Sequence, residues 1–236
     1  MNEHHIASAF DRDLEAIQAQ IMKMGGLVEA AISDAARSLE TRDEELAERV
    51  RKGDKAIDRL EDLINEEAAR VIALRAPTAI DLRLVLSVIK INGNLERIGD
   101  YAKNMAKRTV VLSSMETVDG STASVRRMAR TAEIMLKDAL DSYVHRDADL
   151  ALDVIARDEG LDQMYNALFR EFLTFMMEDQ SQITPCMHLH FIAKNIERMG
   201  DHVTSIAEQV VYLVTGQTPD EARIKADVTS TAVIQE

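Results

Sequence analysis

The sequence predicts an all-α protein made of two tandem three-helix bundles, with six long helices related by an internal repeat. Three observations predict this architecture: a helix-forming composition, a helical periodicity of apolar residues, and a segment that occurs twice. Of the 236 residues, 46% are apolar and 29% are charged, and only nine are Gly and three are Pro. Abundant Ala, Leu, Ile, Met, Glu and Arg favour helices, and few residues are present that would break them.

One segment of seven residues is present in two copies. Residues 94–100 read NLERIGD and residues 195–201 read NIERMGD, a displacement of 101 positions (94 to 195). A repeat of this kind indicates two copies of one structural unit. Around each copy, apolar residues recur at alternating steps of four and three, which is typical of helices packed at shallow angles. Each copy is therefore predicted to lie in a helix of about 30 residues, roughly 45 Å long.

The same apolar periodicity predicts two further helices before each copy, which gives three helices in each half. In chain order, the six apolar stripes run over residues 10–31, 50–74, 84–112, 128–139, 154–175 and 189–213. Thr41 with Glu44, and Thr78 with Asp81, have the spacing of a capping box at the start of a helix. Pro77 is expected to end the helix that precedes it.

The boundaries between the predicted units follow from the remaining punctuation. Thr184 is predicted as the N-cap of the last helix with Pro185 in its first turn, unless that turn begins earlier. Residues 113–124, which contain Asp119 and Gly120, are the predicted joint between the halves. The predicted units are a first bundle over 1–115, a second bundle over 116–216 and a flexible C-terminal tail over 217–236.

Charge and composition exclude several classes of function. The formal net charge is −13, and no block of Lys or Arg could form a basic face, so binding to nucleic acid is not expected. The single cysteine, Cys186, cannot form an internal disulfide. No run of eighteen apolar residues is present, and the first twenty residues lack the apolar segment of a signal peptide. We therefore expect a cytoplasmic protein without membrane insertion.

Each predicted half contains two pairs of carboxylates spaced four residues apart. The pairs are Glu96 with Asp100, Glu197 with Asp201, Asp54 with Asp58, and Asp158 with Asp162. Four residues correspond to 400° around a helix, so both members of a pair point the same way, one turn apart. If Leu95 is an a position of the heptad, Glu96 and Asp100 occupy b and f. The pairs are therefore predicted to project away from the apolar seam.

Two interpretations of these pairs stay open from their spacing. Charged residues at b and f positions are common on any solvated helix face. Like charges one turn apart also destabilise a helix, however, and a bound cation would relieve their repulsion. Carboxylate ligands favour hard ions such as iron(III), Mg²⁺, Mn²⁺ or Ca²⁺ over Zn²⁺.

Other motifs point away from catalysis. None of the six histidines has a Glu three residues before it, so the Glu-x-x-His pattern of di-iron bundles is missing. No phosphate-binding loop, dinucleotide fingerprint or nucleophile elbow is present. His188 and His190 are interpreted as surface or packing residues. Gly99 and Gly200 lie inside predicted helices, where Gly costs about 1 kcal/mol relative to Ala, and they favour a close helix crossing.

At this point the sequence resembles the PhoU family of phosphate-transport accessory proteins. The resemblance covers roughly residues 5–216 and rests mainly on the doubled segment. The residues that carry it are the two repeated segments, Pro77 with residues 81–83, residues 201–208, Phe10 with Leu14, and residues 24–25. The chain departs from strict symmetry, because Glu208 has Lys107 as its counterpart and His202 has Tyr101. The two carboxylate faces are therefore not expected to be equivalent.

The resemblance implies two tandem three-helix bundles and a non-enzymatic negative regulator of high-affinity phosphate uptake and of the phosphate-starvation response. The implied partners are the ATPase subunit of the phosphate ABC transporter and a phosphate-sensing histidine kinase at the inner face of the membrane. Some members of the family carry metal clusters on Glu/Asp-x-x-x-Asp motifs, which match the four pairs above. Homodimer formation stays open. Two alternatives also remain: a carboxylate-based metal-binding protein or metalloenzyme, and a plain helical scaffold.

Overall fold

The computed structural model describes residues 2–116, 118, 120–219 and 229. Six long α-helices and one short 3₁₀-helix account for nearly all of this part of the chain, and it contains no strand. The elements are α1 (Asn2–Thr41), α2 (Glu44–Arg75), α3 (Ile80–Leu112), α4 (Ser121–His145), α5 (Ala148–Glu178), η1 (Gln180–Gln182) and α6 (Ile183–Thr215). The all-α prediction with six helices is confirmed, and the two helices that carry the repeated segment have 33 residues each.

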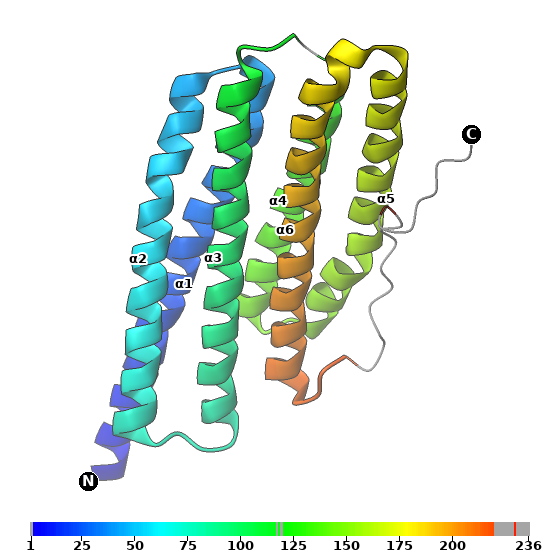
Figure 1. The fold of residues 1–236 in the computed structure, drawn as a ribbon. Coiled ribbons are helices and arrows are strands. Elements are labelled where there is room, and N and C mark those ends of the chain that lie inside the picture. Colours follow the sequence, from blue (N-terminus) through cyan, green and yellow to red (C-terminus); the bar gives the residue numbers. More distant parts are fainter. Residues whose placement is uncertain (1, 117, 119, 220–228, 230–236) are drawn as a thin grey trace.

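The helices form two three-helix bundles that lie side by side with their axes nearly parallel (Figure 1). Helices α1, α2 and α3 pack against one another, and so do α4, α5 and α6. The bundles meet where α3 packs against α6 and where α1 packs against α4. In Figure 1, α2, α3, α6 and α5 form a front row with α1 and α4 behind it. One continuous apolar core runs through both bundles.

Several helix ends differ from the capping predictions. Thr41 is the last residue of α1, where its hydroxyl donates to the carbonyl of Arg37, and Asp43 caps α2 by accepting from the Leu46 amide. Asp43 rather than Thr41 is the N-cap because its backbone is extended and its carboxylate lies three residues before the Leu46 amide. Thr78 does not cap α3 either, since the cap position belongs to Ala79 and carries no side-chain bond.

The last helix begins earlier than Thr184, which matches the alternative left open for it. Helix α6 starts at Ile183, and Pro185 therefore lies inside the first turn, where a missing amide proton costs nothing. The joint between the halves runs from the end of α3 at Leu112 to the start of α4 at Ser121. Most of the predicted C-terminal tail lies outside the described residues.

Candidate functional site

The four carboxylate pairs lie where α2 meets α3 and where α5 meets α6, and most of their members are covered. Their burial contradicts the prediction that they project away from the core. The exposed fractions are 5% for Asp54, 2% for Asp158, 2% for Asp162 and 4% for Glu197. Helices α3 and α6 each pack against three other helices, so the side opposite one apolar seam is covered by a neighbour. Asp58 alone among the eight is exposed.

In the first half, a lysine joins the carboxylates of α2 and α3. Lys103 Nζ donates to Asp54 Oδ2 and to Asp100 Oδ1, each at 2.5 Å. The other oxygen of Asp54, Oδ1, is buried without a hydrogen-bond partner among the described residues. A buried carboxylate needs positive charge or donors nearby, and the Lys103 ammonium supplies that charge. The first half therefore holds a cation that belongs to its own chain.

The proximity of these acids changes their pKa values. Burial, followed by the negative charge of Asp100, raises the pKa of Glu96 to about 7. Burial and then the charge of Asp54 raise the pKa of Asp58. Burial acts to lower the pKa of Lys103, but its hydrogen bonds to Asp100 and Asp54 outweigh burial and raise it. The first cluster therefore keeps its ammonium ion charged while one of its acids, Glu96, is half protonated near neutral pH.

The second half repeats the acids with a different arrangement of cations. The position equivalent to Lys103, again 101 residues along the chain, is Thr204, whose buried hydroxyl donates to the carbonyl of Gly200 at 2.9 Å. Lys194 Nζ instead lies 2.9 Å from Glu197 Oε2 and 4.9 Å from the ring centroid of Tyr165. The counterpart of Lys194 in the first half is Gly93. The acids are thus retained in both halves, whereas the lysine stands at different positions.

Gly99 and Gly200 allow the close helix approach that their positions predict. A methyl group added at Gly99 would lie 3.0 Å from Ile57 Cδ1, on α2. One added at Gly200 would lie 2.3 Å from Leu161 Cδ2 and 3.0 Å from Asp158 Oδ1. Both are shorter than ordinary van der Waals contacts, so α3 and α6 approach their partners through these glycines. The crossing is tighter in the second half.

The histidines of α6 lie at the contact with α3 and among aromatic side chains. His202 Nδ1 is 2.7 Å from Asn94 Oδ1, and its ring centroid is 5.6 Å from that of Tyr101. Positions 101 and 202, one of the equivalent pairs at which the two copies of the repeat differ, therefore face each other across the two halves. The His190 ring lies 5.9 Å from Tyr165 and 5.4 Å from Phe169, as the packing interpretation predicts.

The donor set suits hard cations, but the side chains as placed do not form a finished metal site. Among the described residues, no three His, Cys, Asp or Glu side chains are arranged to hold a metal ion. In the first half, Lys103 fills the space between Asp54 and Asp100, so these residues do not fit a metal ion as they stand. In the second half, the buried oxygens of Asp158, Asp162 and Glu197 have the chemistry of a site for a hard cation.

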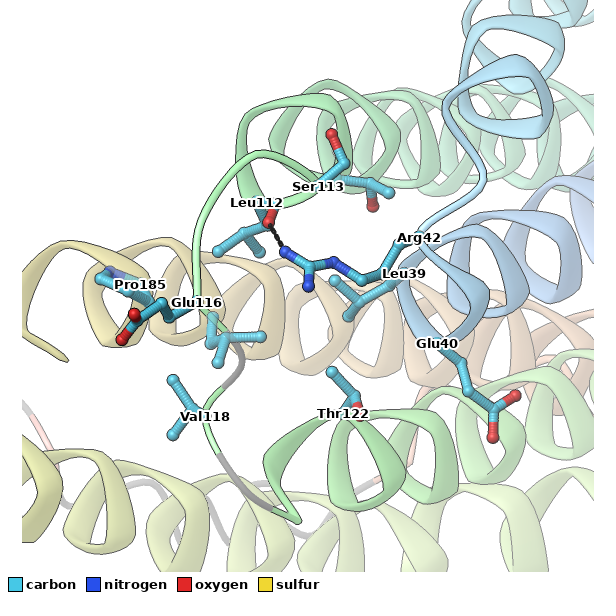
Figure 2. Close-up of a pocket in the computed structure, with 11 residues that line it drawn as sticks. Leu39, Glu40, Arg42, Leu112, Ser113, Glu116, Val118, Thr122 and Pro185 are labelled. Carbon is cyan, nitrogen blue, oxygen red and sulfur yellow. Dashed lines mark hydrogen bonds between the residues drawn. The ribbon is translucent and has the colours of Figure 1, made fainter.

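A small cavity lies at the end of the molecule where the joint between the halves passes (Figure 2). It has a volume of about 60 Å³ and is lined by parts of α1, α3, α4, α6 and the joint. Arg42 Nη2 donates to the carbonyl of Leu112 at 2.8 Å and to that of Met115. Because Glu40 and Glu116 also line it, the cavity is a poor anion site. The hydrogen bonds of Arg42 connect the joint to the turn between α1 and α2.

Sequence reasoning missed Lys103 and Lys194, two lysines that pair with acids of the clusters. Each was visible as a charge three residues from an acid of the repeated segment, Lys103 after Asp100 and Lys194 before Glu197. The repeat gives no indication of either lysine, because the equivalent positions in the other half are Thr204 and Gly93. None of the described helices is long and apolar enough to cross a membrane.

Comparison with known proteins gives consistent matches over the whole chain. The family model described as PhoU domain matches residues 21–109 and 125–210. The chain is 44% identical over 231 residues to a protein of Rhizobium meliloti (strain 1021) named phosphate-specific transport system accessory protein PhoU homolog, covering 98% of each chain. A protein of the same name from Caulobacter vibrioides (strain NA1000 / CB15N) is 42% identical, covering 98% of this chain and 100% of the relative.

Two solved structures have the same architecture. The crystal structure of PhoU from Pseudomonas aeruginosa superposes with a TM-score of 0.86 at 39% identity, covering 88% of this chain and 100% of that one. The phosphate transport system regulatory protein PhoU from Streptococcus pneumoniae gives a TM-score of 0.83 at 31% identity, covering 90% and 100%. At these identities, both the sequence and the fold are shared along the chain.

Proposed function

The chain belongs to the PhoU family, and from this premise we propose that it is a non-enzymatic accessory protein of a phosphate-specific transport system. The observation that carries the proposal is the match to the family in both halves, together with relatives of that name over 98% of the chain. The described residues support a binding role, because the clusters hold ion pairs rather than a nucleophile with an adjacent base. Lys103 pairs with Asp54 between α3 and α2, and Lys194 pairs with Glu197 within α6.

In its finer form, the proposal is that the protein is a negative regulator of high-affinity phosphate uptake and of the phosphate-starvation response. It would act as an adaptor between the ATPase subunit of the phosphate ABC transporter and a sensor histidine kinase, which places it in the cytoplasm. Long helices with exposed polar sides offer two such partners separate surfaces. With a net charge of −13, the protein is a poor direct receptor for phosphate, so phosphate would be sensed indirectly or through a bound metal ion.

We further propose that hard cations bind the carboxylates, and that the second half is the stronger site. The residues concerned are Asp158, Asp162, Glu197 and Asp201, with Asp54, Asp58, Glu96 and Asp100 as the weaker equivalent set. Three of the four acids of the second half are buried, and Thr204 stands where Lys103 competes in the first half. A bound Mg²⁺, Mn²⁺, Ca²⁺ or iron ion would neutralise these buried charges and hold α5 to α6.

The regulatory proposal is tested with an alkaline phosphatase reporter of phosphate starvation in a deletion strain grown in abundant phosphate. The reporter is expected to stay high without the protein and to fall when the gene is restored. An unchanged reporter would overturn the repressor role while leaving the fold and the carboxylate clusters intact.

The two alternatives are separated by the double variant Glu96→Ala with Glu197→Ala. A metalloenzyme would lose redox or hydrolytic turnover in this variant, and a plain scaffold would behave as wild type in every assay. The matched control is Glu45→Ala with Glu178→Ala, which removes the same charge from exposed positions near helix ends. For a regulator with functional carboxylates, only the first pair is expected to leave the reporter high.

A further inference from the structure

We propose that the contact between α3 and α6 carries a basic strip that binds an acidic α-helix of a partner protein. The inference deepens the proposed adaptor role, because it names one surface for a protein partner and the chemistry of that partner. It rests on that role only for the existence of such a partner, and its binding test does not use the starvation reporter.

The basic strip consists of the positions of α3 and α6 that meet across their contact, together with the exposed positions beside them. Three pairs of side chains meet there, and they are Asn94 with His202, Arg108 with Phe191, and Arg83 with Tyr212. Residues seven positions apart share one side of a helix, so the strip comprises positions 83–104 and 94–108 of α3 and positions 188–209 and 191–212 of α6, each taken in steps of seven. Helices α1 and α4 lie behind α3 and α6, so the exposed part of the strip lies along the open front of the molecule (Figure 1).

The basic strip differs in charge from the rest of the protein. None of its positions is Asp or Glu, although α3 and α6 contain six acids and the chain has a net charge of −13. Its five cations are Arg83, Lys90, Arg97 and Arg108 on α3 and Arg198 on α6. The sequence does not show this face, because no block of consecutive Lys and Arg forms it. The seven-residue spacing and the packing of two helices bring the cations together.

Four of the five cations have no carboxylate within ion-pairing distance among the described residues. Arg97 is the exception, at 3.6 Å from Glu96 Oε2, and its side chain is still 62% exposed. Elsewhere on the surface arginines do pair with acids of other helices, as Arg126 does with Glu40 at 2.6 Å. Positive charge without a local partner is available to the acids of another molecule.

Arg108 is the cation of the basic strip whose surroundings most favour an added anion. It is half-buried, with Nη1 3.3 Å from His188 Nδ1 and the guanidinium carbon 4.3 Å from the ring centroid of Phe191. Burial lowers the pKa of Arg108, and no carboxylate opposes this effect. A positive charge partly removed from water is stabilised by an anion beside it, and the exposed ring of Phe191 adds an apolar contact.

The spacing of the cations fits an α-helix better than an extended segment. Arg83, Lys90 and Arg97 follow one another at seven residues, or about 10.5 Å along α3. A partner helix with acids at seven-residue steps has the same spacing when it packs at a shallow angle, as α3 and α6 do against their neighbours. From position 83 to position 108 the strip is about 38 Å long, which corresponds to about 25 residues of helix.

Other anionic partners fit the basic strip less well. A nucleic acid presents an unbroken line of phosphates, which the net charge of −13 and the acids Glu96 and Asp100 on the same helix would repel. An anionic membrane surface would meet the same repulsion over a wider area. A partner helix, in contrast, can place its acids at the cations alone.

Fluorescence anisotropy with a labelled acidic peptide tests the strip in the full chain. The probe is a helical peptide of about four heptads, roughly 42 Å long, with Glu at two positions of each heptad and Leu at one. Lys90→Glu with Arg198→Glu, both at exposed positions, is expected to weaken binding by about tenfold or more. The matched control is Arg49→Glu with Lys55→Glu, which makes the same change of charge at exposed positions of α2 and should have little effect. An equal loss in both variants, or no binding by wild type, would overturn the proposal.

Competition experiments separate the proposed partner from other occupants. A peptide of the same composition, scrambled so that Glu no longer recurs every seven residues, is expected to compete weakly. Displacement of the probe by a single-stranded oligonucleotide, or by inorganic phosphate at constant ionic strength, would assign the strip to phosphate groups instead. Self-association in analytical ultracentrifugation that is lost in Lys90→Glu with Arg198→Glu would assign it to a second copy of the chain. Either result would overturn the proposal.

The basic strip and the regulatory proposal fail separately. A starvation reporter that ignores deletion of the gene would refute the regulator, while peptide binding that depends on Lys90 and Arg198 would still establish the strip. Where the reporter does respond, Lys90→Glu with Arg198→Glu is expected to leave it high and the α2 control to lower it. A reporter lowered equally by both variants would contradict the use of the strip by the adaptor. Equal urea unfolding midpoints would show that both variants fold.

Discussion

The two halves of the molecule retain the same acids at the same places and neutralise them differently. In the first half Lys103 joins α2 to α3, and in the second Lys194 pairs with Glu197 while Thr204 takes the Lys103 position. Since both halves keep the acids but carry the lysine at different positions, what the two halves share is positive charge beside the acids. A lysine supplies that charge in the structure, and a metal ion is the alternative that the proposed cation site offers.

The largest expected effect comes from placing a lysine at position 204, the equivalent of Lys103 in the second half. Thr204→Lys is expected to weaken Mn²⁺ binding by about a hundredfold, or about 2.7 kcal/mol, because an added ammonium beside Asp158 and Asp201 would repel the metal ion and compete for the same acids. Calorimetric titration of the full chain measures the change. Thr204→Met adds similar bulk without charge, and an equal loss in that variant would show that crowding, rather than charge, was responsible.

Removing the lysine of the first half tests the same comparison through stability. Lys103→Met is expected to lower the free energy of unfolding by about 2 kcal/mol at pH 8, because it leaves Asp54 buried without its cation. The loss is smaller than for a fully buried pair, since the side chains of Lys103 and Asp100 keep 24% and 29% of their exposure. Urea unfolding measures it. Lys90→Met, at an exposed position of α3, is the control and should cost little.

The tighter helix crossing of the second half predicts unequal effects of two matching substitutions. Gly200→Ala is expected to destabilise the protein by about 1.5 kcal/mol, since the clash with Leu161 and Asp158 exceeds the gain in helix propensity. Gly99→Ala should cost less, because the added methyl meets only two methyl groups of Ile57, at 3.0 and 3.3 Å, which need to move by a few tenths of an ångström. Urea unfolding of the two variants in parallel measures the difference, and equal stability would show that the two crossings do not differ in tightness.

The smallest expected effect is a pH dependence confined to the first half. The folded-state pKa of Glu96 is raised from 4.5 to about 7, so the native state binds this proton more tightly than the unfolded state. The stability that the protonated carboxyl contributes is present below about pH 4.5 and is lost as pH rises through 7. Glu96→Gln, which cannot ionise, is therefore expected to match wild type near pH 4.5 and to be more stable by about 1 kcal/mol at pH 8.

Unfolding curves between pH 4.5 and 8 measure this difference. The expected gain is less than the whole shift would give, because the Glu96 side chain keeps 20% of its exposure. Glu45→Gln, at an exposed position, is the control. A Glu96→Gln variant with the pH profile of wild type would show that this carboxyl titrates normally in the folded protein.

The sequence predicts the fold well because periodicity and repetition both report on helix packing. The six stripes correspond to the six helices, and Gly99 and Gly200 mark the crossings. Which threonine or aspartate caps a helix depends on local backbone angles, so Asp43 was missed although it lies between the proposed residues Thr41 and Glu44.

The spacing of the residues predicts the carboxylate pairs, but it does not predict how buried they are or which cations they contact. A heptad assignment considers one seam, but α3 and α6 each pack against three neighbouring helices. Most of the acids predicted to lie on the outside are therefore partly or fully covered. Lys103 was missed because its contact with Asp54 joins residues 49 positions apart in sequence. Such contacts depend on how the helices are rotated against each other, which spacing within one helix does not fix.

The packing of α3 against α6 has a consequence for the synthesis of the protein. The two helices share one core, but α6 is made about 100 residues after α3. At ribosomal rates of roughly 5 to 20 residues per second, the first half waits about 5 to 20 seconds before its partner helix emerges. During that interval one side of α3 is apolar and uncovered, so a nascent chain of this protein is a substrate for chaperones until its last helix is complete.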